Sequence, residues 1–185
     1  MANIQLNNAP FINKQFIVTT PFSQSHHALD LAPYGFAGDL YAIDHFVLTY
    51  KGTHSSYGNY AIFSNENGVM YLYAHMLRLP AKNVGEVYNN HEYIAPAGST
   101  GNSTGVHLHL EMQRGGAWNY SAPFSDYINP CDYLTGIINT ASSSNVYYYD
   151  GSPTPPTPTP SSSGNSKFKW VLYARKLRTN HQKSQ

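Results

Sequence analysis

The chain of 185 residues carries 11 Lys and Arg against 10 Asp and Glu, a net charge of +1, and 41% of its residues are hydrophobic. Its length suits one compact domain with extra segments, and its hydrophobic content is sufficient for a core. No stretch approaches the roughly 18 apolar residues of a membrane-spanning helix, the first residues lack the basic and apolar regions of a signal peptide, and the single Cys131 excludes an internal disulfide.

Short runs rich in β-branched and aromatic residues follow an Asn-rich lead-in at residues 1–15. Turn-forming residues separate these runs, and no segment before residue 130 shows a sustained 3.6-residue apolar period. We therefore expect an all-β fold of antiparallel strands with few, short helices. The expected strands are residues 16–20, 40–43, 45–50, 60–63 and 69–73, with weaker ones at 84–88 and 93–95.

His26 and Asp30 are four residues apart in the segment 25–31. This even spacing places both on the same face of a strand, and it would also do so on a helix. Leu29 and Leu31 take the opposite face, which is the pattern of a strand with one functional side. A histidine and a carboxylate can thus converge, although this spacing alone is a weak signal for a metal.

His75 ends the run of residues 71–75, in which Tyr71, Tyr73 and His75 are expected to share one face. Two interpretations stay open for this residue. It is either a half-buried structural histidine or a residue at the rim of an active site, where strand ends often place functional side chains.

A glycine-rich loop at residues 98–105 leads into an alternating segment at residues 107–112. On a strand, His107, His109 and Glu111 point to one side. The core-facing residues are Leu108, Leu110 and Met112. Imidazole is the commonest protein ligand for zinc, so this pattern predicts half of a metal site. The alternative is a pair of solvated histidines, and the spacing does not decide whether both would bind a metal.

The last third of the chain changes in composition. Residues 115–116 are expected to turn the chain, Trp118 and Tyr120 to form a wall or lid, and residues 129–134 to close the domain. Ser, Pro and Thr dominate residues 136–166, which we interpret as a linker. Six of the eleven basic residues fall in the tail at residues 167–185, whose apolar spacing fits a strand and a helix equally well. The expected domain therefore spans residues 16–135.

Four motifs, taken in order, resemble those of the M23 zinc endopeptidases of the lysostaphin and LytM type. The motifs are His26-x-x-x-Asp30, Tyr57-Gly58-Asn59-Tyr60, Tyr73-Ala74-His75-Met76, and the glycine-rich loop with His-x-His at residues 98–111. The resemblance covers roughly residues 16–134. It implies antiparallel sheets with a long groove over one zinc ion.

The resemblance also implies roles for individual residues. His26, Asp30 and His109 would be the zinc ligands, and His75 and His107 would flank the metal as catalytic histidines. Glu111, on the same strand face, either orients one of the imidazoles by a hydrogen bond or forms a salt bridge at the rim. The residues expected to edge the substrate groove are Tyr57, Tyr60 and Trp118.

Three positions depart from the family pattern. Ala28 and Asn90 stand where the family commonly has glycine, and Val106 stands where it has proline. The segment between Phe22 and His26 is also shorter than in many members. These departures bear on the shape of the groove and on substrate preference, and none of them touches an expected ligand.

The expected activity is hydrolysis of stem or cross-bridge peptides in bacterial peptidoglycan by zinc-activated water. The expected setting is a virion, at a phage tail tip where residues 167–185 would contact another phage tail protein, or else the extracellular cell wall. No nucleic-acid partner is expected. The alternatives are a non-catalytic wall-binding or virion structural module with the same fold, and a secreted bacterial autolysin.

Overall fold

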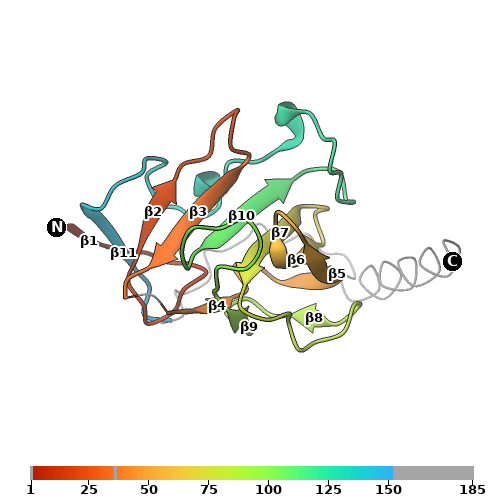
Figure 1. The fold of residues 1–185 in the computed structure, drawn as a ribbon, viewed down its shortest axis with the longest axis horizontal. Helices are drawn as coiled ribbons and strands as arrows, with labels where there is room; N and C mark the ends of the chain where they lie inside the picture. Colours follow the sequence, from red (N-terminus) through yellow and green to blue (C-terminus); the bar gives the residue numbers. More distant parts are fainter. Residues whose placement is uncertain (1, 36, 152–185) are drawn as a thin grey trace, which may run out of the picture.

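The computed structural model describes residues 2–35 and 37–151, and they form a strand-rich fold (Figure 1). The strands are β1 (Ala2–Gln5), β2 (Phe16–Thr20), β3 (Ala28–Pro33), β4 (Asp39–Tyr41), β5 (Phe46–His54), β6 (Gly58–Asn65), β7 (Met70–Met76), β8 (Val87–Tyr88), β9 (Tyr93–Pro96), β10 (Leu108–Gln113) and β11 (Asn145–Tyr148). The only helices within the described ranges are two 3₁₀ turns, η1 (Phe124–Asp126) and η2 (Pro130–Asp132).

The predicted all-β class is confirmed, and each run expected to be a strand contains or overlaps one. β-branched and aromatic side chains favour the pleated conformation, and turn residues such as Gly68 and Gly115, both at positive φ, interrupt it. No helix in the described part of the chain is long and apolar enough to cross a membrane.

One sheet of nine strands, in the order β1-β11-β2-β3-β10-β7-β6-β5-β8, contains most of the fold, and β4 and β9 form a second, two-stranded sheet. Only β5, β6 and β7 form the simple antiparallel meander that neighbouring runs suggest, because β10 inserts between β3 and β7. This insertion places the segment that follows the glycine-rich loop at the middle of the sheet, beside the strand that follows His26 (Figure 1).

The sheet extends beyond residues 16–135, the range expected for the domain. β1 pairs in parallel with β11, and β11 pairs with β2. β1 lies in an Asn-rich segment and β11 follows the serines at residues 142–144, so the sequence assigned them to a lead-in and a linker. Residues 152–166 of the predicted linker and the whole predicted tail at 167–185 lie outside the described residues.

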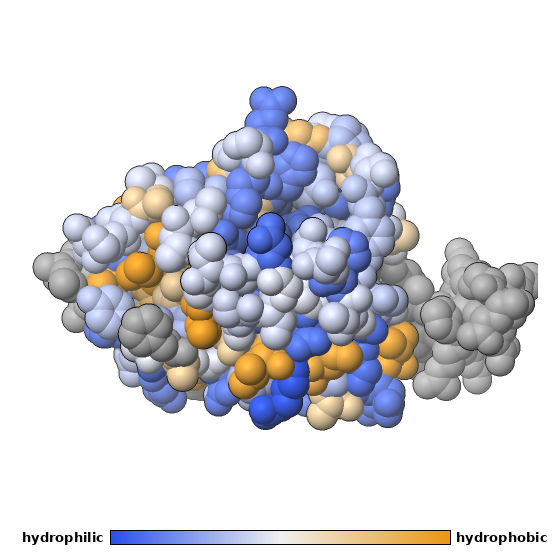
Figure 2. All heavy atoms as spheres, viewed as in Figure 1, coloured by the Kyte–Doolittle hydropathy of each residue, from blue (hydrophilic) through white to orange (hydrophobic). Residues whose placement is uncertain are grey.

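The two faces of the sheet differ because side chains alternate along each strand. Leu29 and Leu31 of β3 and Leu110 of β10 enter the main hydrophobic core, whereas Asp30 and His109 occupy the opposite face. On the side of the molecule seen in Figure 2, hydrophilic side chains occupy most of the upper half, and hydrophobic ones gather along the lower edge, where Figure 1 places β8 and β9. The face of the sheet that carries Asp30 and His109, which we call the functional face, therefore lies opposite the core.

Candidate metal centre

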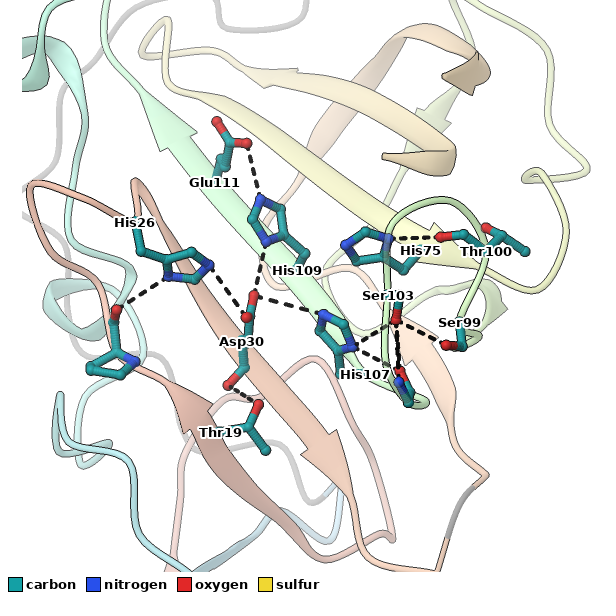
Figure 3. A network of polar contacts seen from close by, with 12 residues as sticks. Thr19, His26, Asp30, His75, Ser99, Thr100, Ser103, His107, His109 and Glu111 are labelled. Atoms are coloured by element: carbon teal, nitrogen blue, oxygen red, sulfur yellow. Dashed lines mark hydrogen bonds and ion pairs between the residues drawn. The ribbon is translucent and has the colours of Figure 1, made fainter. Parts of the chain in front are cut away.

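Asp30 and His109 meet because β3 and β10 are antiparallel neighbours. The register places His109 directly opposite Asp30, and residues opposite each other in a pair share one face. Nδ1 of His109 lies 2.8 Å from Oδ1 of Asp30. In Figure 3, Asp30 lies at the centre of the cluster, between His26, His107 and His109.

His26 completes a group of three ligand atoms that lie within 4.8 Å of one another, together with Asp30 and His109. Its Nε2 is 3.3 Å from Oδ2 of Asp30, and its Nδ1 is 3.2 Å from the carbonyl oxygen of Pro21. The expectation that His26 shares a strand with Asp30 is wrong, since β3 begins at Ala28. Reciprocal backbone hydrogen bonds between Ser23 and His26 close a tight turn before the strand, and this turn directs the imidazole to Asp30.

Glu111 follows His109 on the same face of β10. Its Oε1 accepts a hydrogen bond from Nε2 of His109 at 3.0 Å, and its side chain is 4% exposed. This burial favours the interpretation that Glu111 orients an imidazole over that of a salt bridge at the rim. With Nε2 donating to Glu111, the unprotonated Nδ1 of a neutral His109 faces Asp30 and is available to a metal.

His75 lies on the functional face, contrary to the expected pattern. Tyr71 and Tyr73 enter the core as alternation predicts, but the ring centroid of His75 is 4.7 Å from that of His107 and 5.5 Å from that of His109. His75 has φ +60°, a conformation that L residues rarely adopt, and Met76 takes the place in the core. The strand alternation therefore slips by one residue at His75, which turns its imidazole towards the centre.

Backbone carbonyls fix the orientation of both flanking histidines. Nδ1 of His75 donates to the carbonyl oxygen of Thr100 at 2.8 Å, and Nδ1 of His107 donates to that of Gly105 at 2.8 Å. Each neutral imidazole then keeps its lone pair on Nε2. Nε2 of His107 lies 3.9 Å from Oδ1 of Asp30, so this atom faces the centre (Figure 3).

The carboxylates of the cluster favour the positively charged form of His109. Burial opposes the charged imidazole, but hydrogen bonds to Asp30 and Glu111 outweigh burial and raise the pKa of His109 to about 9. Burial would likewise raise the pKa of Asp30, yet hydrogen bonds from His109 and His26 hold it well below its usual range. Burial lowers the pKa of His75, which is therefore neutral at pH 7.

The donor set fits a zinc ion. Two imidazole nitrogens and one carboxylate oxygen are borderline and hard ligands of the kind zinc binds in catalytic sites, where three protein ligands leave a coordination position open. The second nitrogen of each ligating imidazole is held by another acceptor, Pro21 for His26 and Glu111 for His109. Such secondary contacts fix the ligand tautomer and orientation.

Two hollows lie on the same face of the sheet, one on each side of β10. The first has a volume of about 740 Å³ and includes Asp30, His107 and Thr19 in its lining. The second has a volume of about 610 Å³ and includes Tyr57, Tyr60 and Trp118. The cluster around Asp30 therefore lies between the two hollows.

Of the residues expected to edge a groove, Tyr57 comes nearest the centre. Its ring centroid lies 5.9 Å from that of His109, and burial together with the charge of Glu111 raises its pKa. Tyr60 and Trp118 line the second hollow with Tyr57. The structure thus places the aromatic residues to one side of the cluster. The five residues that it brings together are His26, Asp30, His75, His107 and His109.

Sequence reasoning missed the carbonyl groups that hold the histidines, because any residue type can supply a carbonyl. One signal was available in the spacing of the glycines between residues 98 and 105. Gly101 and Gly58 approach so closely that a Cβ on either would overlap the backbone of the other loop. This approach positions the carbonyl of Thr100 beside His75.

Comparisons with known proteins agree with this geometry. The sequence profile described as peptidase family M23 matches residues 24–121. A stretch of 70 residues is 43% identical to the DD-carboxypeptidase/endopeptidase Mpg of Neisseria meningitidis serogroup B, and Mpg of Neisseria gonorrhoeae matches equally. That alignment covers 38% of this chain and 16% of the Neisseria protein, so the chain corresponds to a small part of these relatives.

Solved structures share the fold. The catalytic domain of lysostaphin from Staphylococcus simulans is similar with a TM-score of 0.53 and 22% identity, over 66% of this chain and 92% of that one. A chain of the SpoIIQ–SpoIIIAH pore-forming complex is similar with a TM-score of 0.56 and 14% identity, over 71% of this chain and 91% of that one. At these identities the similarity establishes a lysostaphin-like fold and no more.

Proposed function

Because the chain belongs to peptidase family M23, we propose that it is a zinc-dependent endopeptidase that hydrolyses stem or cross-bridge peptides of bacterial peptidoglycan. The observation that carries the proposal is the convergence of His26, Asp30 and His109 within 4.8 Å, flanked by His75 and His107. The name of the Neisseria relative, a DD-carboxypeptidase/endopeptidase, supports the reaction class.

The metal would be held by Nε2 of His26, a carboxylate oxygen of Asp30 and Nδ1 of His109. A zinc ion held there supplies Lewis acidity, which makes water nucleophilic near neutral pH and polarises a peptide carbonyl. Glu111 strengthens His109 as a ligand by accepting a hydrogen bond from its Nε2–H group. Asp30 contributes the one negative charge among the three ligands.

His75 and His107 perform the proton transfers in this proposal. Each presents Nε2 on the functional face while its Nδ1 is held by a carbonyl oxygen. A neutral Nε2 accepts the proton of the attacking water, and a protonated Nε2 donates a hydrogen bond to the developing oxyanion or a proton to the departing amine. Burial keeps His75 neutral at pH 7, so His75 is suited to accept the first proton.

A non-catalytic module is the second candidate function. The observation that favours it is the fold shared with a chain of the SpoIIQ–SpoIIIAH pore-forming complex, since one fold hosts unrelated functions. The presence in this chain of three ligand residues and two oriented flanking histidines supports catalysis instead. Hydrolysis of isolated sacculi separates the two functions.

We place the activity at the bacterial cell wall, from a virion or from outside the cell. The proposed substrate lies there, and the Pro- and Thr-rich segment with its basic end after Gly151 suits a spacer that carries a contact to a virion protein or a wall polymer. Removing residues 152–185 is expected to weaken retention on cells or virions while zinc binding persists.

Digestion of purified sacculi, followed by mass spectrometry of the soluble fragments, tests the proposed function. Hydrolysis produces one new amine and one new carboxylate for each bond cleaved, so the fragments identify the bond. The wild-type protein is expected to release such fragments, and His109→Ala is expected to release none. Fragments from His109→Ala at the wild-type rate would contradict the proposal.

A further inference from the structure

The hollow beside Tyr57 is walled by aromatic rings. Tyr50, Tyr57, Tyr60, Trp118 and Tyr120 line a space of about 610 Å³ over β5, β6 and β7. The rings of Tyr50 and Tyr60 and those of Tyr57 and Tyr60 have centroids 5.3 Å apart, so they form a continuous surface. Tyr57 also lies against His109, and the hollow therefore adjoins the metal centre.

The wall formed by Trp118 and Tyr120 is anchored to the sheet. Gln113, at the end of β10, is 1% exposed, and its side-chain amide donates to and accepts from the backbone of Asn119 at 3.0 and 3.1 Å. These two bonds hold the loop between Trp118 and Tyr120 against the functional face. The hollow is thus a feature of the folded domain and does not depend on a partner to form its wall.

The chemistry of the lining selects a neutral ligand. Among the residues that the structure describes, no Asp, Glu, Lys or Arg lines the hollow, and its one titratable side chain besides the tyrosines is that of His54. Its polar groups include tyrosine hydroxyls, and the hydroxyls of Tyr60 and Tyr120 are 2.9 Å apart. Tyr50 lies against Tyr60, so three hydroxyls that can both donate and accept line the hollow. A ligand with carbon–hydrogen faces and several neutral polar groups matches this surface.

The peptide part of the proposed substrate offers few groups that combine apolar faces with neutral polar atoms. Stem peptides present carboxylates and ammonium groups, which would lose hydration in an aromatic hollow without gaining a charged partner. Their alanine methyl groups are too small to fill about 610 Å³. The glycan strand carries N-acetylated amino sugars, which combine apolar ring faces with neutral hydroxyl and acetamido groups. We propose that this hollow binds an N-acetylated amino sugar of the glycan strand to which the cleaved peptide is attached.

This proposal rests on the proposed peptidase function, and it adds that the enzyme recognises sugar and peptide together. The prediction is a preference for cross-linked peptides that still carry their disaccharides over the same peptides freed of sugar. Loss of one aromatic wall should reduce the preference by about 10-fold, because the ring supplies apolar area that the sugar would cover.

The first experiment compares kcat/KM for these two substrates. Tyr120 is 60% exposed, so Tyr120→Ala is expected to fold, and Tyr93→Ala, 39% exposed on β9, is the matched control. The wild-type protein and Tyr93→Ala are expected to prefer the sugar-bearing substrate by about 10-fold or more. Tyr120→Ala should bring the ratio towards one. Equal kcat/KM for both substrates in the wild-type protein would overturn the sugar site while leaving the peptidase function intact.

The second experiment measures binding without catalysis. The chain has two tryptophans, so Trp170→Phe in the full chain leaves Trp118 as the reporter of fluorescence. Tetra-N-acetylchitotetraose is the probe. Saturable change in Trp118 fluorescence, weakened about 10-fold in Tyr120→Ala, supports the site even if no peptide is cleaved. No change at millimolar probe would overturn it.

Discussion

His109 lies directly opposite Asp30 across the β3–β10 pair, with Nδ1 2.8 Å from Oδ1. The two residues are 79 positions apart in the chain. Their approach depends on β10 inserting between β3 and β7, and a slip of one residue in the register would turn His109 and Glu111 towards the core. The hydrophobic alternation of β10 prevents this slip, because Leu108, Leu110 and Met112 are all fully buried.

Glu111→Gln tests the carboxylate that orients His109. Glutamine keeps the size of the side chain and an acceptor oxygen but removes the charge that stabilises the Nε2 hydrogen of His109. We expect zinc affinity to fall about 10- to 100-fold, as for other partners of ligating histidines. Competition with a chromophoric chelator measures this affinity. Glu66→Gln, at an exposed position, is the control, and equal affinities of the two variants would contradict the assigned role.

Two variants of His75 separate the effect of its strained backbone from the effect of its imidazole. At φ +60°, glycine is unstrained whereas alanine keeps the unfavourable conformation. Both His75→Gly and His75→Ala should lose hydrolysis of sacculi, but the glycine variant should be more stable than the alanine variant by about 1 kcal/mol. Urea denaturation of the two variants measures the difference. A more stable alanine variant would indicate that His75 does not hold a positive φ.

Gly101→Ala tests the loop that positions His75. A methyl group at this position, which has φ +75°, would overlap the backbone of Gly58 and displace the carbonyl of Thr100. We expect kcat to fall by about 10-fold or more with zinc still bound, because small misplacements of catalytic groups are costly. At Gly105 an added methyl group meets nothing within 4 Å, so Gly105→Ala should lose far less activity. Similar kcat values for the two variants would exclude this mechanism.

The metal-free protein should lose stability as pH rises. The pKa of His109 is raised to about 9 in the folded state, so its interaction with the carboxylates is fully present below its ordinary value of 6.5 and is lost as pH rises through about 9. We expect the free energy of unfolding to fall by up to roughly 3 kcal/mol across this range. Urea titrations of chelated protein between pH 6 and 9.5 measure it. His109→Gln should lack this decline, and a stability that rises with pH would contradict the assignment.

The sequence predicted the faces of β3 and β10 correctly because alternation is a local property. His109 and Glu111 lie on one face of β10, and Leu108 and Leu110 lie on the other, because side chains alternate along a strand. The pairing of β3 with β10 is non-local, and spacing alone could not indicate it. The resemblance to M23 endopeptidases connected His26 and Asp30 with His109, and their ligand atoms do converge.

Other features were hidden from the sequence for physical reasons. A positive φ at a histidine has no signature in residue type, so periodicity placed His75 on the wrong face. The turn that begins at Ser23 replaced the strand expected at His26. β1 pairs with β11, and β11 pairs with β2. These pairings join distant parts of the chain, so the Asn-rich and Ser-rich sequence around the two strands does not indicate them.

Zinc content and sacculus digestion, measured on the same preparation, test the central claim most directly. We predict one zinc ion per chain, peptide fragments released from purified sacculi, loss of both after chelation, and recovery of both when zinc is returned to the wild-type protein but not to His109→Ala. Full activity in wild-type protein that retains no metal after chelation would contradict the account.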